Sequence, residues 1–269
     1  MFRFAKPGAL AAAALAVTLN AGGAATEAVA AETIAVGVSA GPHAQILEQV
    51  KPVAATKGLD IEIVEFTDYV VPNQALADGD LEANSFQHQP YLDNQVRDRG
   101  YDLVSVARTV VFPMGFYSNK VGSLEELPSG ARIAIPNDPT NGGRALLLLE
   151  AKGLIELREG AGLMASPFDV VGNPKDLDIV ELDAAQLPRS LADVDAAAVN
   201  TNYAMESGLD PNRDAIAREE ADSPYTNIIA VRAEDRDAPW VKTLVESYHS
   251  PEVRQFVLDQ FQGAVVPAW

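Results

Sequence analysis

The segment "ANSFQHQPYLD", residues 83–93, brings aromatic and polar side chains together in a chain that has only three histidines. A strand-like run leads into it, and a proline typical of the first turn of a helix follows. Phe86, His88 and Tyr91 should therefore lie at the carboxyl end of a strand, where open α/β sheets bind ligands. With Tyr69 on the preceding turn, these rings predict an apolar pocket suited to a thioether, because sulfur packs favourably against aromatic rings. The alternative is that Phe86 belongs to the core and His88 is a solvated cap residue.

A second candidate is "IPNDPTNGGRALLLLEAKG", residues 135–153, where a strand leads into a helix. Thr140 or Asn141 can cap this helix, and two glycines leave its first turn without bulky side chains. Free N–H groups at such a helix start form a natural anion site. Arg144 lies in the same turn, where the helix dipole disfavours a cation. A bound anion held by the planar guanidinium would explain its position; a surface arginine reaching into water is the alternative.

Two asparagines lie at predicted strand ends in the second half of the chain. Asn200 ends "DAAAVN" and Asn227 lies in "SPYTNIIAV". Each side-chain amide offers one acceptor and two donors, so either could bind the ammonium or carboxylate group of a small zwitterion. An ordinary role in a turn or cap is the alternative.

Metal and enzyme signatures are weak. The three histidines, His43, His88 and His249, are far apart and have no Cys partner, so no metal or other cofactor is predicted. Gly-x-Ser-x-Gly, His-Glu-x-x-His and Gly-x-Gly-x-x-Gly motifs are absent, and no carboxylate pair can be singled out in so acidic a chain. An enzyme would need a general base, for which His88 is the one candidate. We therefore expect a binding protein rather than an enzyme.

The elements that would position these residues alternate between strand and helix, which predicts an α/β protein with mostly parallel sheets. The alternation restarts near residue 132, which favours two lobes, and the extended stretches 110–114 and 227–231 could cross between them. The predicted strands are 33–39, 59–66, 81–86, 101–112, 132–136, 178–182, 195–200 and 225–232. The predicted helices are 43–57, 69–77, 90–99, 141–152, 186–192, 203–207, 238–249 and 251–261.

The first 31 residues have the layout of a secretory signal peptide: a basic start, an apolar run and small residues for cleavage. Without residues 1–31 the chain keeps 18 basic and 37 acidic residues, a net charge of −19, which makes nucleic acid a poor partner. The chain contains no cysteine, which excludes disulfides and thiol catalysis. We expect an exported protein that is soluble rather than lipid-anchored.

Several stretches together resemble one family. These are "GPHAQILEQV", "FTDYVVPNQALADGDLEANSFQHQPYLD", "IPNDPTNGGRALLLLEAKGLI", "DIVELDAAQLPRSL" and "SPYTNII". In this order they are similar to the NlpA-type substrate-binding proteins, the methionine-binding receptors of ABC importers, from about Thr33 to Trp269. The resemblance implies a two-lobed periplasmic binding protein fold, type II-like, with a hinge. We expect one lobe from residues 32–112 plus 228–269 and the other from residues 113–227.

The resemblance also implies roles for the candidate residues. Tyr69, Phe86, His88 and Tyr91 would line the side-chain pocket, and Arg144 would clamp the ligand carboxylate. Asn200 and Asn227 would hold the amino-acid head group, although Asn202 could replace Asn200.

The expected function is capture of L-methionine in the periplasm by a monomer that delivers it to an inner-membrane permease. D-methionine, a methionine dipeptide or another apolar amino acid is the alternative ligand, and an enzyme acting on a small amino acid or a scaffold role is the rival class. Family members typically carry a cysteine after the signal peptide, and this sequence departs from them there.

Overall fold

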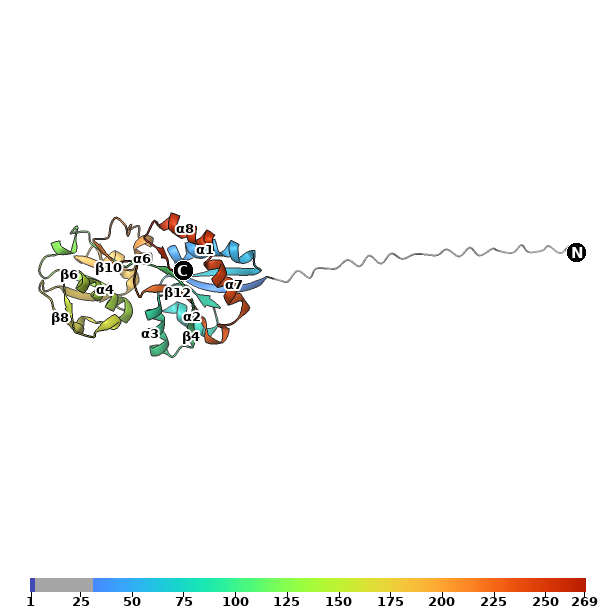
Figure 1. Ribbon diagram of the computed structural model, residues 1–269, viewed down its shortest axis with the longest axis horizontal. Coiled ribbons are helices and arrows are strands. Elements are labelled where there is room, and N and C mark those ends of the chain that lie inside the picture. Colours follow the sequence, from blue (N-terminus) through green and yellow to red (C-terminus); the bar gives the residue numbers. More distant parts are fainter. Residues whose placement is uncertain (3–30) are drawn as a thin grey trace. The chain divides into compact units, whose positions relative to one another are not determined.

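The computed structural model describes residues 1–2 and 31–269, so almost all of the predicted signal peptide, residues 3–30, lies outside the described residues. Residues 31–269 form one compact unit, and all that follows concerns that unit. Within the described part of the chain, no helix is both long and apolar enough to cross a membrane. The unit consists of two lobes, each built on its own β-sheet (Figure 1).

The first lobe is built on a six-stranded sheet with strand order β13-β4-β12-β3-β1-β2. The apolar, β-branched run after residue 31 forms β1, which pairs in parallel with β2 and β3 at one end of the sheet. The remaining pairings, β12 with β3 and β4 and β13 with β4, are antiparallel. The strands are β1 (Glu32–Ser39), β2 (Leu59–Phe66), β3 (Ala83–Asn84), β4 (Leu103–Val111), β12 (Thr226–Arg232) and β13 (Val266–Pro267).

Helices cover both faces of this sheet, because successive side chains of its strands point to opposite sides. Ile229 and Val231 of β12 pack into the core shared with the helices on one face, α1 (Pro42–Ala55), α7 (Pro239–Tyr248) and α8 (Pro251–Phe261). Ile228 and Ala230 pack on the other face with the helices α2 (Val71–Asp78) and α3 (Gln89–Arg99).

The second lobe is built on a five-stranded sheet with strand order β11-β5-β10-β6-β9. The three strands β10, β6 and β9 are parallel, whereas β5 and β11 are antiparallel. The strands are β5 (Gly115–Tyr117), β6 (Arg132–Pro136), β9 (Asp178–Leu182), β10 (Ala196–Val199) and β11 (Ala217–Arg218), and β7 (Glu156–Leu157) pairs separately with β8 (Val170–Gly172). The α-helices are α4 (Pro139–Ala151), α5 (Leu187–Ser190) and α6 (Thr201–Glu206). Short 3₁₀ helices span Leu124–Glu126, Gly162–Met164, Pro167–Asp169 and Ala184–Gln186 here, and Ala233–Asp235 in the first lobe.

The α/β class and the two lobes with mixed sheets are confirmed, but the parallel share is smaller than the alternation predicted. The strands that follow or precede a crossing between the lobes run antiparallel to their neighbours. The predicted strand 81–86 is short, with only Ala83–Asn84 paired in β3. Five two- or three-residue strands, β5, β7, β8, β11 and β13, were not predicted because their sequences carry too little periodicity to be seen.

Two segments connect the lobes. Residues 112–114 connect β4 to β5, as predicted, and residues 219–225 return from β11 to β12. The prediction that residues 227–231 form the second crossing is wrong, because they pair along β4 inside the first sheet. The two crossing segments are bonded to each other, since the N–H of Glu219 donates to the carbonyl of Met114 over 3.0 Å.

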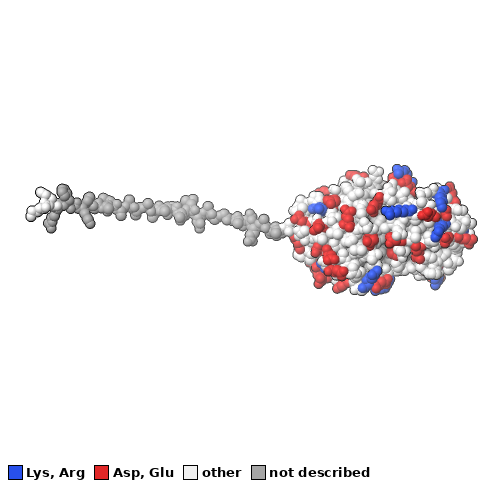
Figure 2. Space-filling view, turned by 180° about the vertical axis from the view of Figure 1, so that it is seen from behind, with Lys and Arg blue, Asp and Glu red and all other residues white. Residues whose placement is uncertain are grey.

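The surface of the compact unit is rich in carboxylates. On the face seen in Figure 2, acidic side chains are spread over both lobes, with basic side chains scattered among them. This distribution agrees with the composition of the sequence, which has 38 acidic and 20 basic residues.

Candidate ligand-binding site

A cleft of about 350 Å³, measured together with its opening to solvent, lies where the two lobes meet. All seven residues singled out from the sequence line it, so the structure brings together every predicted position. Its lining residues are His43, Tyr69, Phe86, Gln87, His88, Tyr91, Phe112, Asn141, Arg144, Asn200, Thr201, Asn202 and Asn227.

One end of the cleft is aromatic. The ring of Tyr69 lies 6.0 Å from that of Phe86 and 6.2 Å from that of Tyr91, and Phe86 and Tyr91 are 6.1 Å apart in an edge-on arrangement. The hydroxyl of Tyr91 donates to the backbone carbonyl of Tyr69 over 2.8 Å. Burial raises the pKa of Tyr69 well above its usual value, so the phenol is uncharged. Neutral rings at these separations form a polarisable wall for an apolar side chain.

A buried cluster of amides holds the loop after β3, which carries Phe86 and His88. Asn73, Asn84 and Gln87 are almost fully buried. The amide of Asn84 donates to Asn73 over 2.9 Å, and Gln87 exchanges bonds of 2.7 and 2.6 Å with Asn73. A polar network buried with its partners satisfied is rigid, so the loop after β3 is fixed. This loop presents Phe86 and His88 to the cleft.

His88 caps α3, but it is buried rather than solvated, which contradicts the alternative of a solvated cap. Its Nδ1 accepts from the N–H of Tyr91 over 3.1 Å, which requires the proton to be on Nε2, and Nε2 lies 3.2 Å from Oδ1 of Asn141. Burial, and then the charge of Arg144, lower the pKa of His88 to about 3. The ring is therefore neutral, and neither nitrogen keeps a free lone pair to act as a base.

His43 is a cleft residue that the sequence reasoning did not assign. Its Nε2 lies 3.2 Å from Oδ1 of Asn227, and its ring lies 4.4 Å from that of Phe112. Burial lowers the pKa of His43 to about 4, so this ring is neutral too. Its Nδ1 is buried without a hydrogen-bond partner among the described residues.

The start of α4 differs from the prediction in its cap. Neither Thr140 nor Asn141 caps the helix; the carboxylate of Asp138 accepts from the N–H of Asn141 over 2.9 Å. The predicted anion site at this helix start is thus already filled by a carboxylate of the chain. The glycines serve packing instead, because a Cβ on Gly142 would lie 2.8 Å from a backbone oxygen of Pro136.

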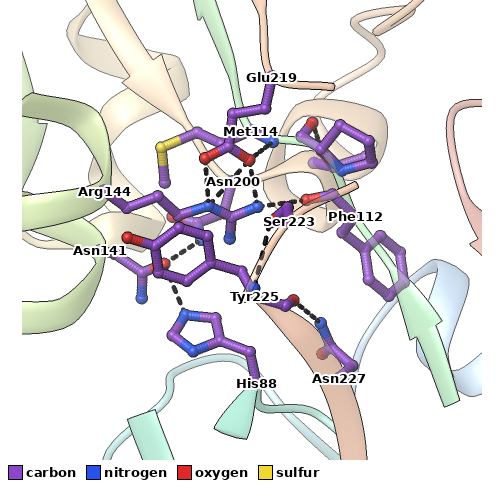
Figure 3. Close-up of polar contacts among 12 residues, drawn as sticks. His88, Phe112, Met114, Asn141, Arg144, Asn200, Glu219, Ser223, Tyr225 and Asn227 are labelled. Atoms are coloured by element: carbon purple, nitrogen blue, oxygen red, sulfur yellow. Dashed lines mark hydrogen bonds and ion pairs between the residues drawn. The ribbon is translucent and has the colours of Figure 1, made fainter. Parts of the chain in front are cut away.

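Arg144 is 2% exposed, which excludes a surface arginine. Its Nε lies 2.8 and 3.0 Å from the two carboxylate oxygens of Glu219, and its Nη2 donates to Glu219 over 2.5 Å and to the carbonyl of Phe112 over 2.7 Å. The Tyr225 ring lies 4.4 Å from the guanidinium carbon, within cation–π range. The third nitrogen, Nη1, takes part in none of these bonds and points toward the side of His88 (Figure 3). The anion expected beside Arg144 is therefore Glu219. The edge of the guanidinium that carries Nη1 remains available to a ligand.

Asn200 and Asn202 both line the cleft, and each has one amide atom bonded and one unbonded. Asn200 donates from Nδ2 to Asn141 over 2.9 Å, and its Oδ1 has no partner. Asn202 accepts at Oδ1 from the hydroxyl of Tyr69 over 2.5 Å, and its Nδ2 has no partner. Buried polar atoms normally have partners, so these two point to a polar ligand group.

The cleft thus combines an aromatic wall with a polar end that offers the Nη1 of Arg144, a free amide donor and a free amide acceptor. None of its lining residues is a carboxylic acid. Among the described residues no three His, Asp or Glu side chains converge as a metal site would require. This arrangement is suited to bind a small zwitterion with an apolar side chain.

The sequence could have indicated His43, because it follows β1 as His88 follows β3, and the carboxyl-end rule applies to both. Nothing local could have indicated Glu219. It stands beside Glu220 in an acidic chain, and its partner Arg144 is 75 residues away.

Known proteins resemble this chain over nearly all of the compact unit. Residues 34–269 match the NlpA lipoprotein family. The D-methionine-binding lipoprotein MetQ of Salmonella typhimurium is 52% identical over 239 residues, which cover 88% of each chain. The probable D-methionine-binding lipoprotein MetQ of Vibrio cholerae is 48% identical over 268 residues, covering 99% of this chain and 100% of the relative.

A solved structure agrees with these sequence matches. A nutrient-binding protein from Burkholderia cenocepacia bound to methionine is 55% identical and superposes with a TM-score of 0.86, covering 88% of this chain and 100% of that one. The match spans both lobes, and the sequence resemblance that began at Thr33 is confirmed. The chain belongs to the NlpA lipoprotein family.

Proposed function

We propose that this protein is the substrate-binding protein of an ABC importer and that it captures L-methionine. The main support for this proposal is the cleft itself. It has an aromatic wall and a polar end with unbonded donor and acceptor atoms. The relative from Burkholderia cenocepacia, 55% identical, was solved bound to methionine, which supports the same ligand here.

In this proposal the ligand thioether packs against Tyr69, Phe86 and Tyr91, since sulfur–aromatic contacts stabilise by about 0.3–1.5 kcal/mol each. His88 closes this wall as a neutral ring.

At the polar end, the carboxylate binds Nη1 of Arg144 and Nδ2 of Asn202. The ammonium group binds amide oxygens, with Oδ1 of Asn200 as the free acceptor. Asn227 contributes to binding of the amino-acid head group by holding the ring of His43, to which it is hydrogen-bonded.

The two lobes, residues 31–111 plus 226–269 and residues 115–218, are proposed to close on the ligand around the crossing segments 112–114 and 219–225. The closed form, a monomer, then docks on an inner-membrane permease. Bonds that join the lobes across the cleft, such as Tyr69 with Asn202 and His88 with Asn141, support closure by a hinge.

We propose that the protein catalyses no reaction. His88 was the one candidate for a general base, and both of its ring nitrogens are occupied. A base must have a lone pair within reach of the proton that it removes. Product formation during prolonged incubation with methionine analogues would contradict this part of the proposal.

The deciding experiment is calorimetric titration of the protein without residues 1–31, after unfolding and refolding to remove any bound ligand. L-methionine, D-methionine, Gly-Met and leucine are titrated in turn. Tight one-to-one binding that is strongest for L-methionine supports the proposal. Because relatives are named for D-methionine, stronger binding of the D-isomer would change the ligand but not the class. No heat with any of the four would refute it.

Arg144→Ala should abolish tight binding of methionine, because the ligand carboxylate would lose its charged partner. Breaking a buried ion pair costs about 3–5 kcal/mol, which corresponds to more than a hundredfold in Kd. The measurement is the same titration, with circular dichroism to verify folding. Arg158→Ala, which removes an exposed arginine from the second lobe, is the control and should bind as the wild type does. An unchanged Kd for Arg144→Ala would remove this residue from the site.

The relatives are named lipoproteins, whereas the 269 residues here contain no cysteine that could carry a lipid on its thiol. We propose that this protein works in the periplasm without that anchor. Detergent phase partitioning of the expressed full chain tests this, and recovery in the detergent phase would contradict it.

A further inference from the structure

Arg144 is held by several partners within the chain. Glu219 binds two of its three guanidinium nitrogens, Nε and Nη2, and the ring of Tyr225 lies against the guanidinium. A bidentate pair of this kind fixes the plane of the guanidinium as well as its place. Only Nη1 takes no part in these bonds, and it points toward the side of His88 (Figure 3).

Glu219 also holds the crossing segment 112–114. Its Oε2 accepts from the N–H of Met114 over 2.9 Å, and its own N–H donates to the carbonyl of Met114 over 3.0 Å. The neighbouring carbonyls in the segment are bonded by Nη2 of Arg144, at Phe112, and by the hydroxyl of Thr201, at Pro113 over 2.6 Å. Three consecutive residues of the crossing are thereby tied to side chains of the second lobe or of the return crossing.

Arg144 separates the cleft from the groove that contains Glu219. Arg144 lines both the cleft and a groove on its other side, and Glu219 and Tyr225 line that groove. Glu219 itself does not line the cleft, so it acts on a ligand there only through Arg144.

We propose that Glu219 is a positioning residue for carboxylate recognition, which orients Nη1 of Arg144 into the cleft and anchors Arg144 to the crossing segment. This rests on the proposed function, because it presumes a ligand carboxylate at Arg144. Without Glu219, Arg144 loses the partner that fixes its plane, and its charge is free to turn toward the open groove. Binding of a carboxylate should weaken, while contacts that do not involve the carboxylate should persist.

The test compares Glu219→Gln with Glu220→Gln, which makes the same charge change on the exposed neighbouring carboxylate. Gln keeps the shape of Glu but cannot accept from both guanidinium nitrogens and from the N–H of Met114 together. Each protein is titrated with methionine and with methionine amide, in which an uncharged amide replaces the carboxylate. Weak ligands are measured by competition, and thermal unfolding verifies folding.

For Glu219→Gln we expect the Kd of methionine to rise at least tenfold and that of methionine amide to change less than threefold. Glu220→Gln should match the wild type with both ligands. Equal weakening of both ligands would show that Glu219 has only a general structural role. Unchanged methionine binding would show that Glu219 does not position Arg144. Tighter methionine binding would show that Glu219 competes with the ligand for Arg144. Each of these results overturns the inference. Failure of the wild-type protein to bind methionine would refute the proposed function instead.

Discussion

At the scale of single residues, the cleft contains two buried histidines that stay uncharged. Burial lowers the pKa of His43 to about 4 and that of His88 to about 3, from an ordinary value near 6.5. Each ring is a neutral, hydrogen-bonded side chain in the lining of the cleft. Their charge states therefore do not change between pH 5 and 8, where ligand capture is expected to take place.

The free energy of unfolding should fall as the pH drops from about 6.5 to 4. Unfolded histidines bind protons below about pH 6.5, whereas the folded rings remain neutral, so protons stabilise the unfolded chain. Each buried histidine adds up to about 1.4 kcal/mol per pH unit to this loss. His88→Gln should make the dependence shallower in urea titrations at a series of pH values. His249→Gln, at a half-exposed histidine outside the cleft, is the control. An equal slope for His88→Gln and the wild type would contradict a neutral His88.

Most residues of the candidate site could be predicted from their position in the sequence relative to nearby predicted strands and helices. Phe86 and His88 lie between β3 and α3, and Arg144 lies in the second turn of α4, one turn later than the sequence predicted. Which atoms of these residues face a ligand was not predictable, because their partners come from distant segments. His43 pairs with a residue 184 positions away, and no spacing rule encodes that contact.

At the scale of elements, α4 depends on glycine for its packing. A Cβ on Gly143 would lie 2.5 Å from the carbonyl oxygen of Leu163 and 3.0 Å from the N of Ala165. Both atoms belong to backbone, which yields less readily than a side chain. Of the two glycines that suggested access for an anion, Gly143 is therefore required by the turn that covers the helix.

Gly143→Ala should destabilise the protein by roughly 1–3 kcal/mol, because the added methyl forces this turn away from α4. In a chain of this size that corresponds to a fall in Tm of several degrees. Gly122→Ala is the control, since its Cβ would meet only the far end of Glu126, at 3.5 Å. Differential scanning calorimetry measures both. Equal Tm values for the two variants would show that the turn adapts without cost.

The sequence predicted the bounds of an element best where a long segment showed regularly spaced apolar residues. The strands β2, β6 and β9 and the helix α8 begin and end where predicted, because turn residues bound each of them. Edge pairings such as β13 were not predictable, since two residues carry no period and their partner strand, β4, is far away in sequence.

At the scale of the whole molecule, the lobes are joined by bonds that are separate from the ligand contacts. The hydroxyl of Tyr203, on α6 of the second lobe, donates to the carbonyl of Thr67 in the first lobe over 3.1 Å. The Tyr203 ring also packs against that of Tyr69, 5.0 Å away. The hydroxyl thus favours the closed arrangement, while Tyr203 does not line the cleft.

Tyr203→Phe should weaken methionine binding about two- to tenfold, because one hydrogen bond contributes about 0.5–1.5 kcal/mol to the closed form. The ring packing is kept, so the effect should lie mainly in faster ligand release, as measured by stopped flow. Tyr101→Phe removes a hydroxyl bonded to Gln74 within the first lobe and should leave binding unchanged. The same Kd and release rate in both variants would mean that this contact does not hold the lobes closed.

The order of strands in the first sheet sets the order in which the lobes can be completed during synthesis. The strand β12 lies between β3 and β4, although it is made only after the entire second lobe. Before β12 is synthesised, the edges of β3 and β4 that will pair with it are therefore unpaired. At that stage the five strands of the second lobe have already been synthesised. Unpaired edges invite association with other chains. Until β12 is available, these edges of the first lobe stay open, and it is in this interval that a chaperone would be needed most.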